Sequence, residues 1–468
     1  MKKKVLSMIL AIIIIMCSIL TACTDSGAYN DSDRLTVYAV NENDMLVRFL
    51  KKFNAYCNVN DREDDCVEFV YFDSYEEYEA KLNAEIMAGK GPDVLALSQN
   101  LPIEKLIKNN NLLDLNEVIN SQNPEFNFDN YNKVVMDSGV FNGKRYILPL
   151  YYCPDFLVTS NSRLEHLDVE LDGTTFVSLC DDINQDEPDC YLVHPDFGDN
   201  FFYSFVNQYI DIRKGTTEFE THEFKNLAPI FRKALVGDSY DDFSSYDAFS
   251  ETNREYLLDS FENGFNAGSF GAFARSYLRS SNYIVVDSME KDTDNEKLFY
   301  PNFNREEKLS ATVEFGLMFS SNCKKYDKVM KLVEYMLSFD SQSYYCGGRE
   351  GDPESTSGGG WLPVNLEVYD ASYKNALEYR IDEYYNESGK VTLSDEVIEK
   401  KNQALSEYYR PLLEDITTCS LYDFESITNT YISKNVLKSP INSYLKGDIT
   451  LDTFISRLTS SVNTYLSE

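Results

Sequence analysis

Histidine and tryptophan are the scarcest residues in this 468-residue chain, which contains three histidines and one tryptophan. The sequence has no C-x-x-C pair, so it lacks a usual ligand arrangement for zinc or an iron–sulfur cluster. The spacings G-x-S-x-G and H-E-x-x-H and the phosphate-binding P-loop are also missing. These absences argue against serine hydrolases, zinc hydrolases and P-loop enzymes. We therefore expect no catalytic residue, no metal and no cofactor.

Positive charge is also in short supply. Lysine and arginine number 43 against 77 aspartates and glutamates, which gives a formal net charge of −34. A surface this acidic repels nucleic acids and anionic lipid headgroups, so we expect no nucleic-acid partner. Among so many carboxylates, pairs at the separation that glycosidases use arise by chance. A secreted glycosidase is therefore the least supported alternative function.

The N-terminus has the order of features found in exported proteins. Three lysines at 2–4 precede a mostly apolar run over 5–20, which is short for a bilayer span. The tetrapeptide Leu-Thr-Ala-Cys at 20–23 resembles the bacterial lipobox. The resemblance implies cleavage before Cys23 and a lipid attached to its sulfur. An ordinary signal peptide and an uncleaved anchor are the alternatives.

Of the ten cysteines, eight follow Cys23 in the chain. Export makes disulfides possible, and the pairs that lie close in sequence are Cys57 with Cys66 and Cys180 with Cys190. Free thiols in an anaerobic organism are slightly favoured instead, because spacing alone does not fix connectivity.

The fold is organised around residues 67–97, which predict a strand, a helix and a second strand. Residues 67–72 are β-branched and aromatic, as in strands, and residues 94–97 form an apolar run typical of a buried parallel strand. The apolar residues between them recur at helical spacing: Tyr75, Tyr78, Leu82 and Ile86. Gly89 and Gly91 are expected to end the helix and Pro92 to stop it resuming. Such a unit predicts an α/β lobe whose ligands bind beyond the carboxyl ends of its strands.

The remaining elements follow from the same patterns. Further strands are predicted at 34–40, within 141–152 after a turn at Asn142-Gly143, at 156–161 and at 312–319. Further helices are predicted at 44–57, 101–110, 326–337 and from 451 onward. The last helix is marked by an apolar stripe of Leu451, Phe454, Ile455, Leu458, Val462 and Tyr465. The C-terminal third is predicted to be helical. A loop with six glycines spans 346–360 and ends in Trp361. The 34 tyrosines and 29 phenylalanines show no localised stripe along the chain.

In order along the chain, several segments resemble extracellular solute-binding proteins of ABC importers, of the maltodextrin- and oligosaccharide-binding group. The matching segments are residues 78–97 with their Gly-Pro-Asp-Val, 112–115, 142–149, 313–339, the Trp-Leu-Pro-Val-Asn at 361–365, and 444–468. The resemblance implies an α/β fold of the periplasmic-binding-protein-like type II. In that fold two discontinuous lobes, each a mixed sheet flanked by helices, are joined by hinge strands with the ligand cleft between them.

The same resemblance implies the organisation and the partners of the chain. The expected parts are a lipoprotein signal peptide (1–22), a tether (23–33), lobe 1 (34–150 plus 313–362) and lobe 2 (151–312 plus 363–468). The protein is expected to be a monomer on the outer face of the membrane of a Gram-positive anaerobe. There it would close over a small ligand, expected to be a carbohydrate, and dock on the permease subunits. A ligand sensor for a membrane kinase is the alternative.

Candidate ligand-binding residues are those that follow the predicted strands of lobe 1 or lie at the crossing. They are Asn41, Glu42, Asp73, Ser74, Ser98, Gln99, Tyr151, Tyr152 and Trp361. Carboxylates and amides bond to sugar hydroxyls, and flat rings cover the apolar faces of sugars. Helix capping is an alternative for Asn41, Glu42, Asp73 and Ser74. Core packing is the alternative for the three aromatic residues.

Overall fold

The computed structural model describes residues 33–40, 45–88, 90–97, 101–160, 202–203, 205–211, 214–236, 274–277, 297–301, 310–346, 362–378, 384–386, 389–391, 399, 406, 410, 414, 416–421 and 432–467. The signal segment, Cys23 and the glycine-rich loop lie outside these residues. Within the described part of the chain, no helix has the length and apolar character needed to cross a bilayer.

The fold begins with three short parallel strands, which lie in the spatial order β2, β1, β3. They are β1 (Thr36–Ala39), β2 (Glu68–Tyr71) and β3 (Val94–Ala96), and β1 pairs in parallel with both of its neighbours. The helix between β2 and β3 is α3 (Tyr75–Met87). The strand, helix and strand predicted over 67–97 are therefore confirmed, and β1 separates the two strands in the sheet.

The ends of α3 follow local sequence signals. Ser74 precedes the helix, and its side chain accepts a hydrogen bond from the backbone N–H of Glu77 at 3.2 Å. This cap satisfies one of the donors that a helix leaves without a partner at its N-terminus. Beyond the other end, Gly91 has a φ of +104°, a conformation that glycine adopts without steric cost.

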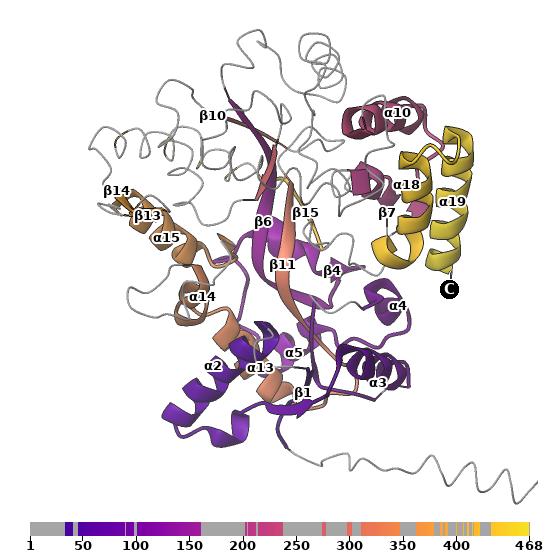
Figure 1. Ribbon diagram of the computed structural model, residues 1–468. Coiled ribbons are helices and arrows are strands. Elements are labelled where there is room, and N and C mark those ends of the chain that lie inside the picture. The colour runs from indigo at the N-terminus through magenta and orange to yellow at the C-terminus, as the bar shows by residue number, and fades with distance from the viewer. Residues whose placement is uncertain are drawn as a thin grey trace, which may run out of the picture.

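Two long antiparallel strands, β6 (Ile147–Ser160) and β11 (Ser310–Phe319), cross the molecule. Figure 1 shows them side by side, running from the helices around β1 toward β10 and β15. The prediction of two strands separated near Pro154 was wrong, because β6 continues through this residue. A proline φ is compatible with an extended chain. Pairing with β11 up to residue 155 and with β9 from residue 155 onward holds this part of β6 extended.

The other strands of the nine-stranded sheet join β6 and β11. β9 (Ala274–Tyr277), β10 (Lys297–Pro301) and β12 (Leu362–Pro363) pair antiparallel with β6, and β15 (Thr418–Ser420) pairs in parallel with the start of β11. One sheet thus extends through both halves of the molecule, with β6 and β11 as its shared strands.

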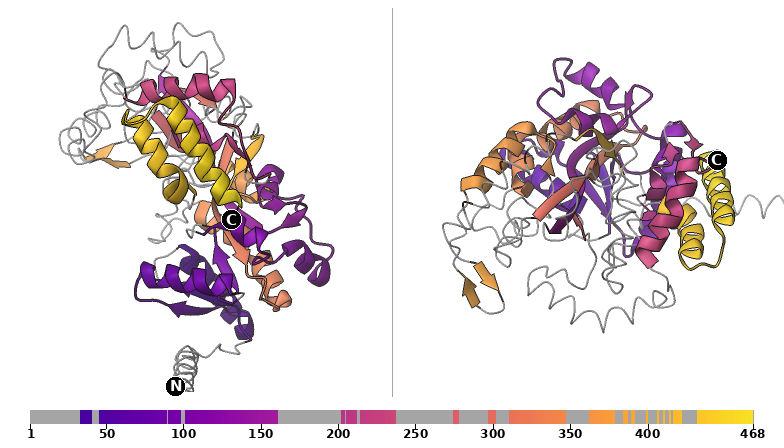
Figure 2. Two further views of the ribbon diagram at one scale, coloured as in Figure 1. Left: turned by 90° about the vertical axis from the view of Figure 1, so that its right-hand side faces the viewer. Right: turned by 90° about the horizontal axis from the view of Figure 1, so that it is seen from above.

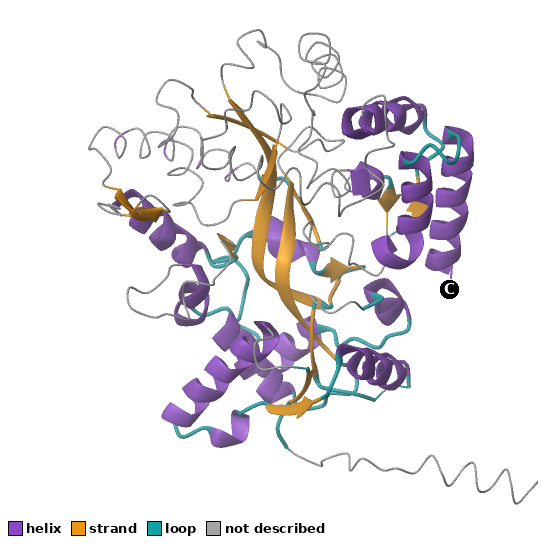
Figure 3. Cartoon of the chain, in the orientation of Figure 1, coloured by secondary structure: helices purple, strands orange, loops and turns teal. Residues whose placement is uncertain are grey.

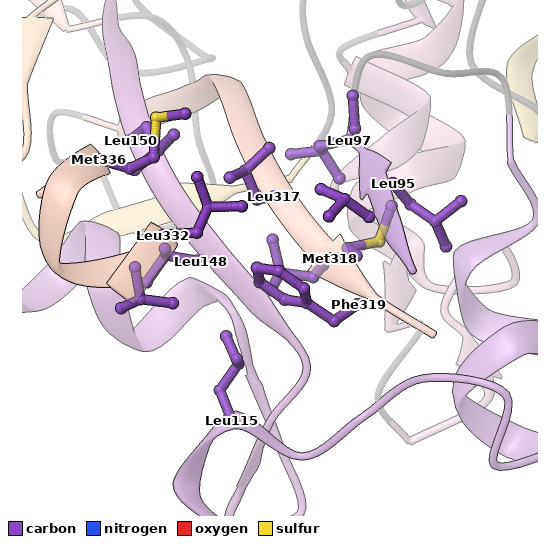
Figure 4. Close-up of a cluster of buried hydrophobic side chains, with 14 of the residues drawn as sticks. Leu95, Leu97, Leu115, Leu148, Leu150, Leu317, Met318, Phe319, Leu332 and Met336 are labelled. Carbon is purple, nitrogen blue, oxygen red and sulfur yellow. The ribbon is translucent and has the colours of Figure 1, made fainter. Parts of the chain in front are cut away.

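The first hydrophobic core, which we call the sheet core, surrounds β1, β3 and the adjoining parts of β6 and β11. Figure 4 shows aliphatic side chains of these strands, including Leu95, Leu148 and Leu317, packed together with Leu332 and Met336. Helices flank the sheet (Figure 3). Those of this half are α2 (Met45–Val59), the 3-10 turn η1 (Glu63–Asp65), α3, α4 (Ile103–Lys108), α5 (Leu115–Gln122), α6 (Lys133–Ser138), α13 (Tyr326–Met336), α14 (Phe339–Cys346) and α15 (Leu366–Glu378).

A second set of buried side chains, which we call the helical core, is not part of that cluster. It joins segment 202–209 to α10 (His222–Val236), the π-helical turn η5 (Ser433–Leu437), α18 (Lys438–Leu445) and α19 (Leu451–Ser467). Both views in Figure 2 show α10, α18 and α19 grouped together. Aromatic rings fill this core: Tyr444 and Phe454 stack at 4.3 Å and Phe205 and Phe231 at 4.4 Å. The predicted stripe of α19 is confirmed, since Phe454, Ile455, Leu458, Val462 and Tyr465 are all buried.

Short hairpins complete the described chain. β4 (Val140–Phe141) and β5 (Lys144–Arg145) flank the predicted Asn142-Gly143 turn, where both residues have positive φ, as such tight turns require. The others are β7 (Ile210–Asp211) with β8 (Thr216–Thr217), and β13 (Tyr384–Asn386) with β14 (Gly389–Val391). The C-terminal third is therefore not wholly helical as predicted, because β13, β14 and β15 lie within it.

Candidate ligand-binding edge

The three parallel strands all end at the edge of the sheet that faces the other half of the molecule. β3 runs antiparallel to the end of β11, whose start pairs with β15 beyond the crossing. The carboxyl ends of β3 and of its parallel neighbours β1 and β2 therefore point toward β15 and the far end of β6. Ligands of open α/β sheets bind beyond such carboxyl ends. We call this side of the molecule the carboxyl edge.

Asp73 is the candidate at this edge whose position the structure describes. It follows β2 and is exposed, while the adjacent Ser74 caps α3. The cap is thus made by Ser74, and the Asp73 carboxylate is left facing solvent at the carboxyl edge. Asn41 and Glu42 follow β1 and Ser98 and Gln99 follow β3 in the sequence, but these four residues lie outside the described part.

The two tyrosines at the crossing have different surroundings. Tyr151 is fully buried, and its hydroxyl lies 3.4 Å and 3.3 Å from the carbonyl oxygens of Ser341 and Gln342, to which it donates. Its ring contacts that of Phe49 at 5.4 Å. This geometry packs α2 and α14 against β6, so Tyr151 positions the crossing strand.

Tyr152 is also buried, with 2% of its surface exposed, but its hydroxyl has a different polar partner. Asn132, the residue that caps α6, donates its side-chain N–H to the Tyr152 hydroxyl at 3.2 Å. Tyr152 also pairs with Leu362 of β12, the residue directly after Trp361. Trp361 itself lies outside the described residues.

Sequence reasoning missed one acidic residue at the crossing, Glu314. The pairing shifts register there: Val313 faces Tyr152, and Phe315 faces Tyr151, so Glu314 is an extra residue in β11. It is buried, with 8% of its surface exposed. Such bulges bend a strand and re-aim side chains, and they are frequent next to binding sites. A single acid inside the apolar run 312–319 was the signal available in the sequence.

The compensating irregularity lies on β6 at Leu150. Its carbonyl accepts hydrogen bonds from the backbone N–H of Val364 and from Nε2 of Gln342, each at 3.2 Å. Asn365 then caps α15 by accepting from the backbone N–H groups of Glu367 and Val368. The Leu-Pro-Val-Asn part of the segment 361–365 is therefore fixed to the crossing.

Asp93, which precedes β3, links three elements. Its carboxylate accepts hydrogen bonds from the backbone N–H and the hydroxyl of Thr36 at 2.9 and 3.0 Å. Lys325, at the start of α13, donates its Nζ to the same oxygen at 2.9 Å. Burial, followed by the nearby Asp93 charge, raises the pKa of the Cys323 thiol to about 12. This network sits at the amino ends of β1 and β3, opposite the carboxyl edge, and its role is structural.

The described residues contain no group of three or more histidines, cysteines or acids that could hold a metal ion. Among the described residues, the carboxyl edge offers the exposed, hydrogen-bonding carboxylate of Asp73. Such groups suit the recognition of a polar organic molecule.

A two-part sheet with shared crossing strands defines the class of fold. It is the fold of the periplasmic-binding-protein-like solute-binding proteins. The sugar-binding protein MalE from the phytopathogen Xanthomonas citri has a TM-score of 0.56 at 13% identity, over 93% of this chain and 97% of that one. The cyclic alpha-maltosyl-1,6-maltose binding protein from Arthrobacter globiformis scores 0.53 at 15% identity, over 92% and 98%. An ABC substrate-binding protein from Listeria monocytogenes in complex with cycloalternan scores 0.52 at 13% identity, over 93% and 99%.

The sequence also matches a family. Residues 50–375 match the family described as bacterial extracellular solute-binding protein, and the chain belongs to it. No curated protein matches the chain in sequence. The predicted family and fold class are thus confirmed.

Proposed function

We propose that this protein is a lipid-anchored solute-binding protein that delivers a sugar or oligosaccharide to an ABC importer by closing two lobes over it. The observation that carries the proposal is the shared carboxyl edge of β1, β2 and β3. It faces the second half of the molecule across the crossing strands. Membership of the solute-binding family and the sugars named for structural neighbours support this substrate class.

The proposed ligand contacts come from the residues that follow the strands. They are Asn41 and Glu42 after β1, Asp73 after β2, Ser98 after β3, and Tyr152 and Trp361 at the crossing. Tyr151 lies in the core and positions the crossing strand. Carboxylate and amide groups bind vicinal hydroxyls, and the indole ring covers an apolar sugar face. The protein leaves its ligand chemically unchanged.

The proposed lobes are residues 34–150 with 313–362 and residues 151–312 with 363–468, except that α15 (Leu366–Glu378) packs against the sheet core and is proposed to move with the first lobe. Attachment through Cys23 places them on the outer face of the cell membrane, where the permease is the partner. An acidic surface gives no electrostatic attachment to anionic lipids, so retention depends on the fatty chains. Membrane fractionation tests this part. Cys23→Ala should release the protein from membranes, and full retention of that variant would contradict the anchor.

A thermal-shift screen against a panel of mono- and oligosaccharides tests the ligand class. A sugar present at about 100 times its dissociation constant adds about 2.7 kcal/mol to the free energy of unfolding. Asp73→Asn should reduce the shift. Glu79→Gln is the matched control, because Glu79 is an exposed acid on α3 away from the carboxyl edge. Formation of a product from any sugar would contradict the proposed binding function. Equal thermal shifts for Asp73→Asn and Glu79→Gln would contradict the proposed role of Asp73.

A further inference from the structure

The C-terminal end of α19 contacts α4, although the two helices belong to different cores. The Tyr465 hydroxyl donates a hydrogen bond to Oε2 of Glu104 at 2.8 Å. The ammonium of Lys105 lies 4.8 Å from the centre of the Tyr465 ring. Lys108 donates its Nζ to the backbone carbonyl of Ser467 at 2.9 Å. More than 350 residues separate the partners in the sequence.

Each helix is packed in its own core. Leu101, Ile103 and Leu106 place α4 in the sheet core. The buried face of α19 packs into the helical core through Phe454, Leu458 and Val462. The contacts between Tyr465, Ser467 and α4 therefore join two bodies whose apolar interiors are separate.

The chemistry of the contact is complementary. A helix leaves its last carbonyl groups without intrahelical partners, and its dipole gives that end partial negative charge. The side chains of Lys105 and Lys108 bring two cations to this end of α19. Lys108 donates a hydrogen bond to one of these carbonyl groups, that of Ser467. The Tyr465 ring lies beneath one cation and its hydroxyl reaches Glu104, so one side chain satisfies two partners.

The position of the contact relates it to ligand binding. β3 ends at Ala96 on the carboxyl edge, and α4 begins at Ile103, a few residues further along the chain. The contact between α4 and α19 thus joins the two bodies a few residues beyond the end of a strand at the carboxyl edge. It exists in the arrangement of the bodies that this structure shows, and separating the bodies at this point would break it.

We propose that Tyr465, Lys105 and Lys108 form a latch that stabilises the closed arrangement and so sets ligand affinity without touching the ligand. A contact present in one of two conformations shifts their populations by its own free energy. A ligand that binds the closed form then gains affinity by the same factor, and factors of about 5 to 150 are typical of such coupling. The expected effect on ligand affinity rests on the proposed function. The expected effect on the arrangement of the two bodies does not.

The test compares the full mature chain carrying Lys105→Gln, Lys108→Gln and Tyr465→Phe with a control carrying Lys133→Gln and Lys214→Gln. Both sets remove two lysines, and the control lysines are exposed residues that pair within their own segments. Phenylalanine keeps the ring that α19 buries, so the helical core is preserved. Without any sugar, small-angle scattering should show a larger radius of gyration for the latch variant and an unchanged radius for the control. Equal radii for wild type, control and latch variant would overturn the latch.

Two further measurements separate the possible causes. Hydrogen exchange over residues 451–467 should remain slow in the latch variant; rapid exchange would mean that α19 has detached, which overturns a contact between intact bodies. With maltotriose as the probe, the latch variant should bind about tenfold more weakly, through faster dissociation. Equal or tighter binding of maltotriose would overturn the assignment to the closed form. A wild-type protein that fails to bind maltotriose bears on the proposed ligand, and the scattering result still decides the latch.

Discussion

The two cores of this protein are built from different side chains. The sheet core is mainly aliphatic, with leucines and valines from strands and helices that alternate along the chain (Figure 4). The helical core is mainly aromatic, with Phe205, Phe224, Phe231, Tyr444 and Phe454 in ring contact.

The helical core gathers part of the phenylalanine and tyrosine that are abundant in the sequence. The rings show no stripe along the chain, because the helical core collects them from segments as distant as 202–209 and 438–458. Folding brings these segments together, and only then do the rings become a cluster. The comparison also predicts that the two cores respond separately to mutation.

The largest effect is expected in the helical core. Phe454→Ala removes a fully buried ring that stacks on Tyr444 at 4.3 Å, and it should lower the free energy of unfolding by about 3–5 kcal/mol. Hydrogen exchange should accelerate in α10, α18 and α19 before it does so in β1 and β3. Phe339→Ala, at a ring that is 40% exposed, is the control and should have a much smaller effect. Uniform acceleration in both cores would contradict their independence.

The corresponding change in the sheet core is Leu317→Ala. Leu317 is fully buried on β11, opposite Leu148 of β6, so its truncation leaves a cavity and should cost about 2–5 kcal/mol. Because β11 is shared by both halves, we expect this change to accelerate exchange on both sides of the crossing. An effect confined to β1 and β3 would show that the crossing strands do not couple the halves. Urea unfolding monitored by circular dichroism gives the magnitude.

A smaller effect is expected from Asp93→Asn. The substitution removes the charge that pairs with Lys325 and weakens the link among β1, β3 and α13, at a cost of about 1–3 kcal/mol. Ligand binding should persist, since this network lies at the amino ends of the strands. Urea unfolding and the sugar thermal-shift assay measure the two properties on the same protein. Loss of binding in a folded variant would contradict the structural role.

The sheet-core half also contains a carboxylate that should make stability depend on pH. Burial disfavours ionisation of Asp65, but hydrogen bonds from Lys331 and Arg62, each at 2.8 Å, lower its pKa overall. A lowered pKa contributes stability that is complete above the unfolded value of about 3.9 and is lost as the pH falls through the folded value. Wild type should therefore lose its advantage over Asp65→Asn progressively as the pH falls below about 5 and through the lowered folded pKa of Asp65. A stability difference independent of pH would contradict this.

The smallest effect concerns the reactivity of the Cys57 thiol toward alkylating agents and involves no change in the fold. Burial, followed by the charge of the neighbouring Cys66, raises the pKa of the Cys57 thiol to about 11. Since only the thiolate reacts with alkylating agents, about one molecule in a thousand is reactive at Cys57 near pH 8. Mass spectrometry after iodoacetamide treatment should find Cys57 unmodified in the folded protein and modified in urea. Resistance in urea that disappears with a reductant would instead reveal a disulfide between Cys57 and Cys66, which are both free thiols in this structure.

Local patterns predicted much of the fold. The periodic apolar residues of α13 and α19 and the Asn142-Gly143 turn lie where expected, because caps, turns and helical faces depend on neighbouring residues. The continuous strand through Pro154 was not predicted. Pairing with β9 and β11 decides that the chain stays extended there, and those partners are distant in sequence.

The sequence predicted where the candidate site lies, beyond the strand ends, but only some of the residues that form it. The rule that ligands bind beyond strand ends nominated Asp73, which the structure places exposed at the carboxyl edge. The same reasoning could not find Glu314, because the bulge that inserts it exists only when β11 pairs with β6. Nor could it separate Tyr151 from Tyr152, whose different partners come from α14 and α6.

The sequence by itself determined the class of protein: an acidic chain with alternating strands and helices and no pattern of a known catalytic centre. Those properties depend on composition and on neighbours within a few turns, which the chain carries even before it folds. Only the tertiary structure decided that rings from distant segments meet in a second core, that β6 and β11 shift register at Glu314, and that α19 reaches α4. Each of these depends on residues that are far apart in sequence and meet only when long-range packing outweighs the entropy of bringing them together.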